Sequence, residues 1–260
     1  MADFSVPVHP RLEPHLSADF LTGRPSLGWF ADDGNILVLK SHSTVYFAIP
    51  KNANSSMKVF LSKYLGTSSD ADVALHTVNY ENAKLKEEGA MVDKSGASKC
   101  KGYFKFAIVR NPWDRLVSAY RDKIRQPGYS DSEITDGLHE GLWSFGRMFR
   151  AGMKFDDFVT SIMNIPDYIS DRHFRSQYSY IYDESGTCLV DYIGRYELLG
   201  DALSHIGQQI GISFADFPHV RPSSRSPYTD YYTPKTRDLI AQRYATDLAL
   251  FGYTYGGQVA

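Results

Sequence analysis

The hydrophobic positions near the start of the chain first follow the pattern of strands and then that of a helix. Residues 36–39 and 45–49 are short apolar runs rich in β-branched side chains, so they predict two strands. From Ser55 onward, apolar residues recur with helical spacing at Met57, Phe60, Leu61, Tyr64 and Leu65. This stretch therefore predicts a strand, a short loop and an amphipathic helix.

The same order of elements recurs in the middle of the chain. Residues 104–109 predict a buried strand. Asn111 and Pro112 then mark the start of a helix, and Asp114 is placed to complete a capping interaction. The apolar stripe of this helix consists of Trp113, Leu116, Val117, Tyr120 and Ile124.

The second half of the chain predicts further elements. Its pattern indicates a helix over 155–163, a strand over 188–193 and a helix over 198–210 that a glycine ends. Residues 127–152 carry several glycines and charges, so they predict a long excursion with a short helix around 143–149.

A last helix is predicted close to the C-terminus. Thr233 can cap it, Pro234 begins it and Gly252 ends it. Its apolar stripe consists of Ile240, Tyr244, Leu248 and Phe251.

Strands that alternate with helices predict an α/β fold. We expect it to be P-loop-like, with a central parallel sheet flanked by helices in three layers. The 260 residues, 43% of them hydrophobic, can bury one substantial core, so we expect one domain over 1–260. Residues 1–30 show no clear periodicity and predict an irregular N-terminal arm.

Charge and cysteine content narrow the classes of function. The net charge of -2 and the pI of about 6.4 exclude a broad basic face for nucleic acid, so an anion site must be a local cluster. With only Cys100 and Cys188, a disulfide-stapled secreted scaffold is not expected, and their pairing stays open. Residues 1–21 lack the apolar run of a signal peptide or anchor, so we expect a cytoplasmic protein with no integral membrane segment.

The loop after the second predicted strand is suited to an anion. A helix start presents unpaired backbone N–H groups and a positive dipole end. Here Lys51 adds a cation, while Ser55 and Ser56 add hydroxyl donors. The whole loop consists of Pro50, Lys51, Asn52, Ala53, Asn54, Ser55 and Ser56. The alternative is a solvated Lys51 and a Ser55 that is only an N-cap.

A second candidate anion site follows the strand at 104–109. Arg110 comes directly after it, and Ser118 lies two turns into the next helix, off the apolar stripe. The alternative is an arginine in a structural ion pair and an exposed serine. If the two strands are parallel neighbours, both sites lie at the same carboxyl edge of the sheet, where ligands of open α/β folds bind.

These two segments resemble motifs of the carbohydrate sulfotransferases that use 3′-phosphoadenosine 5′-phosphosulfate (PAPS), including the chondroitin, dermatan and heparan 2-O-sulfotransferase relatives and bacterial members. The loop at 50–56 is similar to their 5′-phosphosulfate-binding motif, and residues 109–121 are similar to their 3′-phosphate-binding motif. Weaker similarity continues at 173–177, where Ser176 replaces the usual proline, and at 191–197 and 251–253.

The resemblance implies a sulfotransferase that releases adenosine 3′,5′-bisphosphate (PAP) by in-line displacement at sulfur. No residue spacing predicts a metal site, and this displacement does not require a divalent ion. The resemblance also implies that Lys51, Ser55 and Ser56 contact the 5′-phosphosulfate, and that Arg110 and Ser118 hold the 3′-phosphate. Arg225, in a Pro/Ser-rich loop, would close over the nucleotide, although a solvated arginine is the commoner case. The implied acceptor is a hydroxyl of a saccharide or glycoconjugate.

An acceptor hydroxyl is a poor nucleophile, so a general base is expected, and histidine has a suitable pKa. His76 is our first candidate because it lies between the two motifs, where relatives carry a catalytic histidine. His173 is the second candidate, as a base or an acceptor contact. The alternatives are a surface or capping His76 and a buried His173 bound to the backbone.

Other functions also fit a loop that binds a nucleotide. A small-molecule kinase is disfavoured because the loop lacks the glycines of the pattern G-x-x-x-x-G-K-S/T. In addition, the strand at 104–109 runs straight into Arg110, with no clear Walker-B acid at its end. A nucleotide-sensing module without turnover stays open. So does PAPS-dependent sulfation of a small molecule that is not a sugar.

Overall fold

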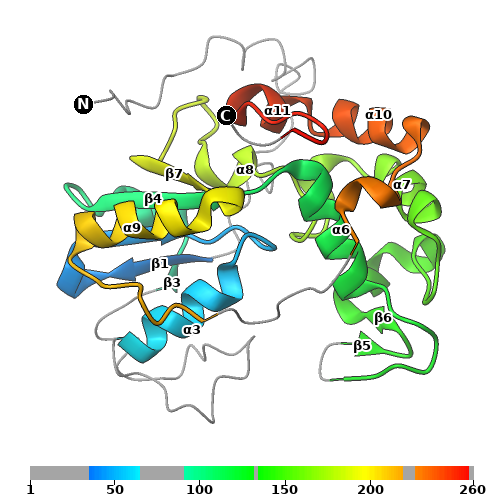
Figure 1. Cartoon of the computed structure of the whole chain (residues 1–260), viewed down its shortest axis with the longest axis horizontal. Helices are drawn as coiled ribbons and strands as arrows, with labels where there is room; N and C mark the ends of the chain where they lie inside the picture. The colour runs from blue at the N-terminus through cyan, green and yellow to red at the C-terminus, as the bar shows by residue number, and fades with distance from the viewer. Residues whose placement is uncertain (1–34, 65–90, 132–133, 219–225, 258–260) are drawn as a thin grey trace. The chain divides into compact units, whose positions relative to one another are not determined.

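The computed structural model describes residues 35–64, 91–131, 134–218 and 226–257 (Figure 1). His76, Arg225 and the arm at 1–30 lie outside these residues. The chain divides into two compact units. Of the described residues, 35–64, 91–109 and 180–218 form the sheet unit, and the others form the helical unit. The single domain stays a prediction.

The sheet unit contains a five-stranded sheet in the order β3-β1-β2-β4-β7. Its strands are β1 (Ile36–Leu39), β2 (Thr44–Phe47), β3 (Met91–Val92), β4 (Phe104–Val109) and β7 (Tyr192–Arg195). The β2–β4 and β4–β7 pairs are parallel, whereas β1 is antiparallel to both β2 and β3. The predicted α/β class is confirmed, but the sheet is mixed. The reason is that only four residues join β1 to β2, which is too short for a parallel crossover.

Helices α3 (Asn54–Tyr64) and α9 (Leu199–Ile210) lie on the same side of this sheet (Figure 1). Alternate strand residues and the apolar stripes of both helices form one cluster that includes Tyr46, Phe106, Ile108, Leu61 and Ile206. The intervening strand residues, such as Val45, Phe47 and Ala107, are buried as well. A sheet buried on both faces explains why its strands read as continuous apolar runs.

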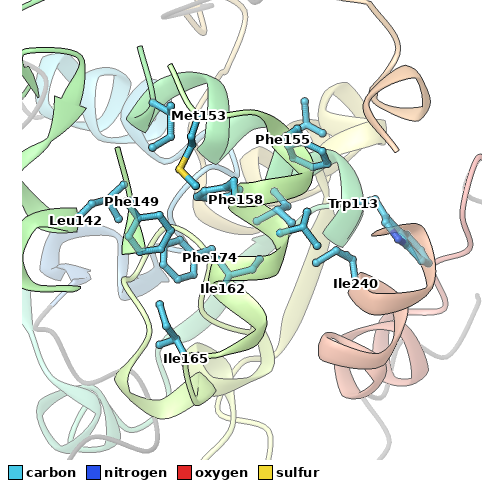
Figure 2. Packing of buried hydrophobic residues seen from close by; sticks show 14 of the residues in the cluster. Trp113, Leu142, Phe149, Met153, Phe155, Phe158, Ile162, Ile165, Phe174 and Ile240 are labelled. Atoms are coloured by element: carbon cyan, nitrogen blue, oxygen red, sulfur yellow. The ribbon is translucent and has the colours of Figure 1, made fainter. Parts of the chain in front are cut away.

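The helical unit is built mainly from short helices and 3-10 turns. They are α6 (Pro112–Lys123), η2 (Glu140–Met148), α7 (Phe155–Met163), η3 (Asp167–Ile169), η5 (Tyr228–Tyr231), α10 (Pro234–Arg243) and α11 (Ala245–Phe251), with a hairpin of β5 (Ile134–Thr135) and β6 (Leu138–His139). Figure 2 shows its aromatic core, where Phe149, Phe158 and Phe174 approach one another with ring centroids 5.6–5.9 Å apart. Phe174, which follows His173 directly in the sequence, belongs to this core.

Helix boundaries agree with the predicted caps. The Asn111 side chain accepts from the Trp113 N–H at 3.1 Å, and Pro112 opens α6. Thr233 and Thr236 form a reciprocal capping box at α10. Asp114 has a partner that the capping prediction did not include, because its carboxylate accepts from Arg110.

Three predicted elements differ from the structure. The strand expected at 188–193 pairs only from Tyr192, because Cys188 instead bridges to Tyr182. The expected single last helix breaks at Tyr244, whose hydroxyl donates to the buried Phe174 carbonyl at 2.6 Å. In the excursion expected at 127–152, η2 corresponds to the short helix expected around 143–149, but the β5–β6 hairpin was not predicted.

The cysteines and the lengths of the helices were the two other features on which the sequence allowed expectations. Cys100 and Cys188 are both free thiols. Among the helices that the structure describes, none is long and apolar enough to cross a membrane.

Candidate functional site

The loop between β2 and α3 has an unusual backbone. Lys51 and Ala53 both adopt the left-handed region, with φ of 72° and 59°. This conformation costs a residue with a side chain roughly 1–2 kcal/mol, so the surroundings must hold it in place. Asn52, between them, is completely buried, and its Nδ2 donates to the Ile108 carbonyl at 2.8 Å. The loop is therefore fastened to the end of β4.

This loop leads directly into the first turn of α3. The Met57 N–H donates to the Ala53 carbonyl at 2.9 Å, so Ser55 and Ser56 lie inside the first turn. Ser55 is not the N-cap, which answers the alternative raised for it. Ser56 is buried, whereas Lys51 and Ser55 are half-buried. The arrangement combines a helix start, two hydroxyls and one cation, which suits an anion. That the loop binds one stays a prediction.

Arg110 begins the second candidate site, in the helical unit. Its Nε donates to Asp114 Oδ2 at 2.7 Å, and a second guanidinium nitrogen lies 2.7 Å from the same oxygen. The structural ion pair that was considered as the alternative is therefore present. This ion pair leaves a role in phosphate binding open as a prediction, because a guanidinium has five N–H donors in a fixed fork. Ser118 lies one turn beyond Asp114 on α6 and is half-buried, not exposed.

The sheet places the ends of β2 and β4 at one edge, because the two strands are parallel neighbours with Phe47 opposite Ala107. The contact between Asn52 and Ile108 extends this proximity to the Lys51 loop. Arg110 follows Ile108 by two residues but belongs to the helical unit. The meeting of Lys51 and Arg110 at one nucleotide therefore stays a prediction.

His173 is buried and makes two contacts with Asp171. Its Nδ1 lies 2.7 Å from Asp171 Oδ1, and its backbone N–H donates to the same oxygen at 2.8 Å. Burial opposes ionisation of this carboxyl, but the charge and hydrogen bonds of His173 outweigh it and hold the pKa of Asp171 at about 2. An ionised carboxylate only accepts, so Nδ1 carries a proton and Nε2 is the position suited to a base.

A second histidine lies against the first. The rings of His139 and His173 meet edge to face with centroids 5.5 Å apart. His139 Nδ1 accepts from the Gly141 N–H at 3.1 Å. Burial, and next the positive charge of Lys123, lower the pKa of His139, so its ring is neutral at pH 7. Because the two histidines are 34 positions apart, no local spacing in the sequence predicted this pair.

Asp171 was also missed, although it stands two residues before His173 in the sequence. The pattern Asp-x-His was the available signal. The predicted sites at His76 and Arg225 lie outside the described residues. Within the described part of the chain, no group of three histidine, cysteine or acidic side chains is placed to hold a metal.

Known proteins resemble this chain over most of its length. The chain matches the sulfotransferase family over residues 34–254. Carbohydrate sulfotransferase 10 of Xenopus laevis and of Homo sapiens are each 27% identical to it over 238 residues, which cover 84% of this chain and 67% and 66% of those proteins.

Carbohydrate sulfotransferase 9 of Homo sapiens is 25% identical over 247 residues, which cover 84% of this chain and 53% of that protein. The chain thus spans about half to two thirds of these relatives. No solved structure matches it significantly. The match to the family covers far more than half of the chain, and the protein therefore belongs to the sulfotransferase family, as its two motifs predicted.

Proposed function

We propose that the protein transfers a sulfuryl group from PAPS to a hydroxyl of a carbohydrate acceptor. Membership of the sulfotransferase family supports the reaction, and the names of the similar carbohydrate sulfotransferases 9 and 10 support the acceptor class. The observation that carries the proposal is the Lys51 loop. Its two left-handed residues and the Asn52 hydrogen bond fix the loop backbone at a helix start, and such a start suits an anion.

In this proposal the two ends of the donor have separate sites. Lys51, Ser55 and Ser56 bind the 5′-phosphosulfate, while Arg110 and Ser118 bind the 3′-phosphate. PAPS carries several negative charges divided between these ends, so two separated cationic sites with fixed donors suit it. Arg225 is assigned to the nucleotide by resemblance alone.

The reaction is an in-line displacement at sulfur. The acceptor oxygen forms a bond to sulfur while the bond between sulfur and the bridging phosphate oxygen breaks, and PAP leaves with that electron pair. Lys51 neutralises the charge that develops on the bridging oxygen, which is the kind of electrostatic help that supplies much of an enzyme's rate gain. The hydroxyl proton passes to a base.

We assign this base to His173 or His76. The contact between His173 and Asp171 supports His173, because a carboxylate at Nδ1 fixes the ring tautomer that leaves Nε2 to accept a proton. His76 keeps its support from the resemblance. A pH–rate profile of His173→Ala and His76→Ala separates them, because removal of the base abolishes the limb of the profile that reports its ionisation.

Ligand-dependent thermal unfolding tests the donor site. PAP without magnesium should stabilise the protein, by about 2.7 kcal/mol when its concentration is a hundred times the dissociation constant. Stabilisation by ATP with magnesium and not by PAP would instead favour a kinase. Incubation with labelled PAPS and a panel of saccharides then tests turnover. PAP binding with no transfer to any acceptor would favour a nucleotide sensor.

A further inference from the structure

The backbone of Arg110 is held on both sides by one side chain. Gln177 Oε1 accepts from the Arg110 N–H at 2.9 Å, and Gln177 Nε2 donates to the Arg110 carbonyl at 2.8 Å. Gln177 is completely buried, and Arg110 is 5% exposed. The side-chain amide makes the pair of hydrogen bonds that a neighbouring strand would make, although Arg110 lies one residue beyond the end of β4.

Gln177 is itself fixed by Asp247, a fully buried residue of α11. Asp247 Oδ2 accepts from the Gln177 backbone N–H at 2.8 Å and lies 3.4 Å from Gln177 Nε2. Its other oxygen accepts from the Tyr178 N–H at 2.8 Å. Since a carboxylate accepts, it holds the amide with Nε2 on its own side and with Oε1 toward the Arg110 N–H.

A buried arginine connects this segment to α6. Arg115, 2% exposed, donates to the carbonyls of Arg175 at 2.7 Å and Arg172 at 3.2 Å. Burial raises the pKa of Asp247, and the charge of Arg115 acts against that rise. The Arg110 side chain is meanwhile held at its far end by Asp114. Arg110 is thus fixed at its backbone and at its guanidinium.

We propose that Gln177 is a positioning residue for Arg110. By holding the Arg110 backbone, Gln177 fixes the position from which the guanidinium binds an anionic group of the ligand. The inference rests on the proposed function, in which that group is the 3′-phosphate of PAPS. A forked contact between a guanidinium and a phosphate needs both partners within a few tenths of an ångström of their best geometry. Two buried hydrogen bonds to the Arg110 backbone supply that precision.

The test compares two ligands that differ only in the 3′-phosphate. PAP and adenosine 5′-monophosphate (AMP) are titrated calorimetrically into the parent protein and into Gln177→Met, which keeps the side-chain volume and removes both hydrogen bonds. We expect the affinity for PAP to fall about tenfold or more and the affinity for AMP to change less than about twofold. Gln177→Asn, whose shorter amide cannot reach both Arg110 atoms, should act in the same direction if Gln177→Met does not fold.

Two further variants separate positioning from a general structural effect. Ser179→Ala removes a buried hydrogen bond to the Ser176 carbonyl, 2.7 Å long, in the same segment, and should keep the parent ratio of PAP to AMP affinity. Arg110→Ala should lower that ratio, and adding Gln177→Met to it should lower it no further, because both changes act through one side chain.

An unchanged PAP-to-AMP ratio in Gln177→Met overturns the inference, as does full additivity with Arg110→Ala. A parent protein that binds both ligands equally contradicts the proposed donor site itself, before any variant is compared.

Discussion

Lys51 combines a cationic side chain with a strained backbone. Its φ of 72° persists because the neighbouring Asn52 is buried and bonded to β4. Strain of this kind is retained where the surroundings impose it, and it is common at binding sites. The backbone from which the Lys51 side chain extends is therefore fixed.

Replacement of Lys51 by alanine should therefore affect the chemical step more than nucleotide binding. We expect the turnover number to fall by about 10²–10³, the usual cost of losing one preorganised electrostatic contact, while PAP affinity falls much less. Single-turnover kinetics and calorimetric PAP titration measure the two quantities. The exposed Lys101→Ala in the same unit is the control. Equal losses in turnover and PAP affinity would remove the role given to Lys51.

The contact between Asp171 and His173, one of the candidate bases, also contributes to the stability of the protein. The pKa of Asp171 is about 2 in the folded protein against 3.8 for an ordinary aspartate, so its contribution is present above pH 3.8 and is lost as pH falls toward 2. Asp171→Asn should cost about 2 kcal/mol of unfolding free energy at pH 7, and roughly half of that at pH 3. Urea unfolding of both proteins at several pH values checks this. A difference that stays constant with pH would contradict the assignment.

At the scale of elements, the sequence predicted best where a strong pattern was bounded by caps. The bounds of β4 and α7 agree with the predicted 104–109 and 155–163. The offset of β7 and the break at Tyr244 could not be predicted, because they depend on tertiary contacts to Tyr182 and Phe174.

The same division applies to the candidate site. The loop at 50–56 is local, so residue types and spacing were sufficient to predict it. Gln177 and Asp247 act on residues 67 and 70 positions away in the sequence, and His139 meets His173 only through the fold. Hydrogen bonds between distant segments leave no periodic trace in a single sequence.

The hydrogen bond that joins the β2–α3 loop to the end of β4 can be tested by itself. Asn52→Ala removes the bond to Ile108 and leaves a buried carbonyl without this donor, so the unfolding free energy should fall by about 1–3 kcal/mol. Because the loop geometry is released, the KM for PAPS should also rise. Urea unfolding and initial rates measure the two effects. Lost stability with an unchanged KM would show that the donor does not use this geometry.

At the scale of the whole molecule, charge is organised locally. The chain has a net charge of -2, yet it concentrates buried cations such as Arg110 and Arg115 near one stretch of sequence. A protein with so small a net charge binds an anion at a local cluster of cationic side chains and not through a large electrostatic field over its surface. The cytoplasmic location expected from composition stays a prediction.

Buried titratable groups make the stability of the whole protein depend on pH in opposite directions. Burial raises the pKa of Asp247 to about 6, despite the hydrogen bonds from Gln177 and Tyr178. Its favourable contribution is therefore complete below pH 3.8 and is lost as pH rises through 6. The lowered pKa of His139 has the opposite effect. Burial disfavours the protonated ring, so the contribution of His139 to stability is lost as pH falls.

A comparison of the parent with Asp247→Asn isolates the first effect, because the contribution of His139 is common to both proteins and cancels in the difference. Asparagine resembles the protonated carboxyl, so between pH 4 and pH 8 the variant should gain about 2.4 kcal/mol of unfolding free energy relative to the parent. Urea unfolding across this range measures the gain, with Asp238→Asn, an exposed aspartate of α10, as the control. If the difference between parent and variant does not change with pH, Asp247 is ionised in the folded protein as readily as an aspartate in water.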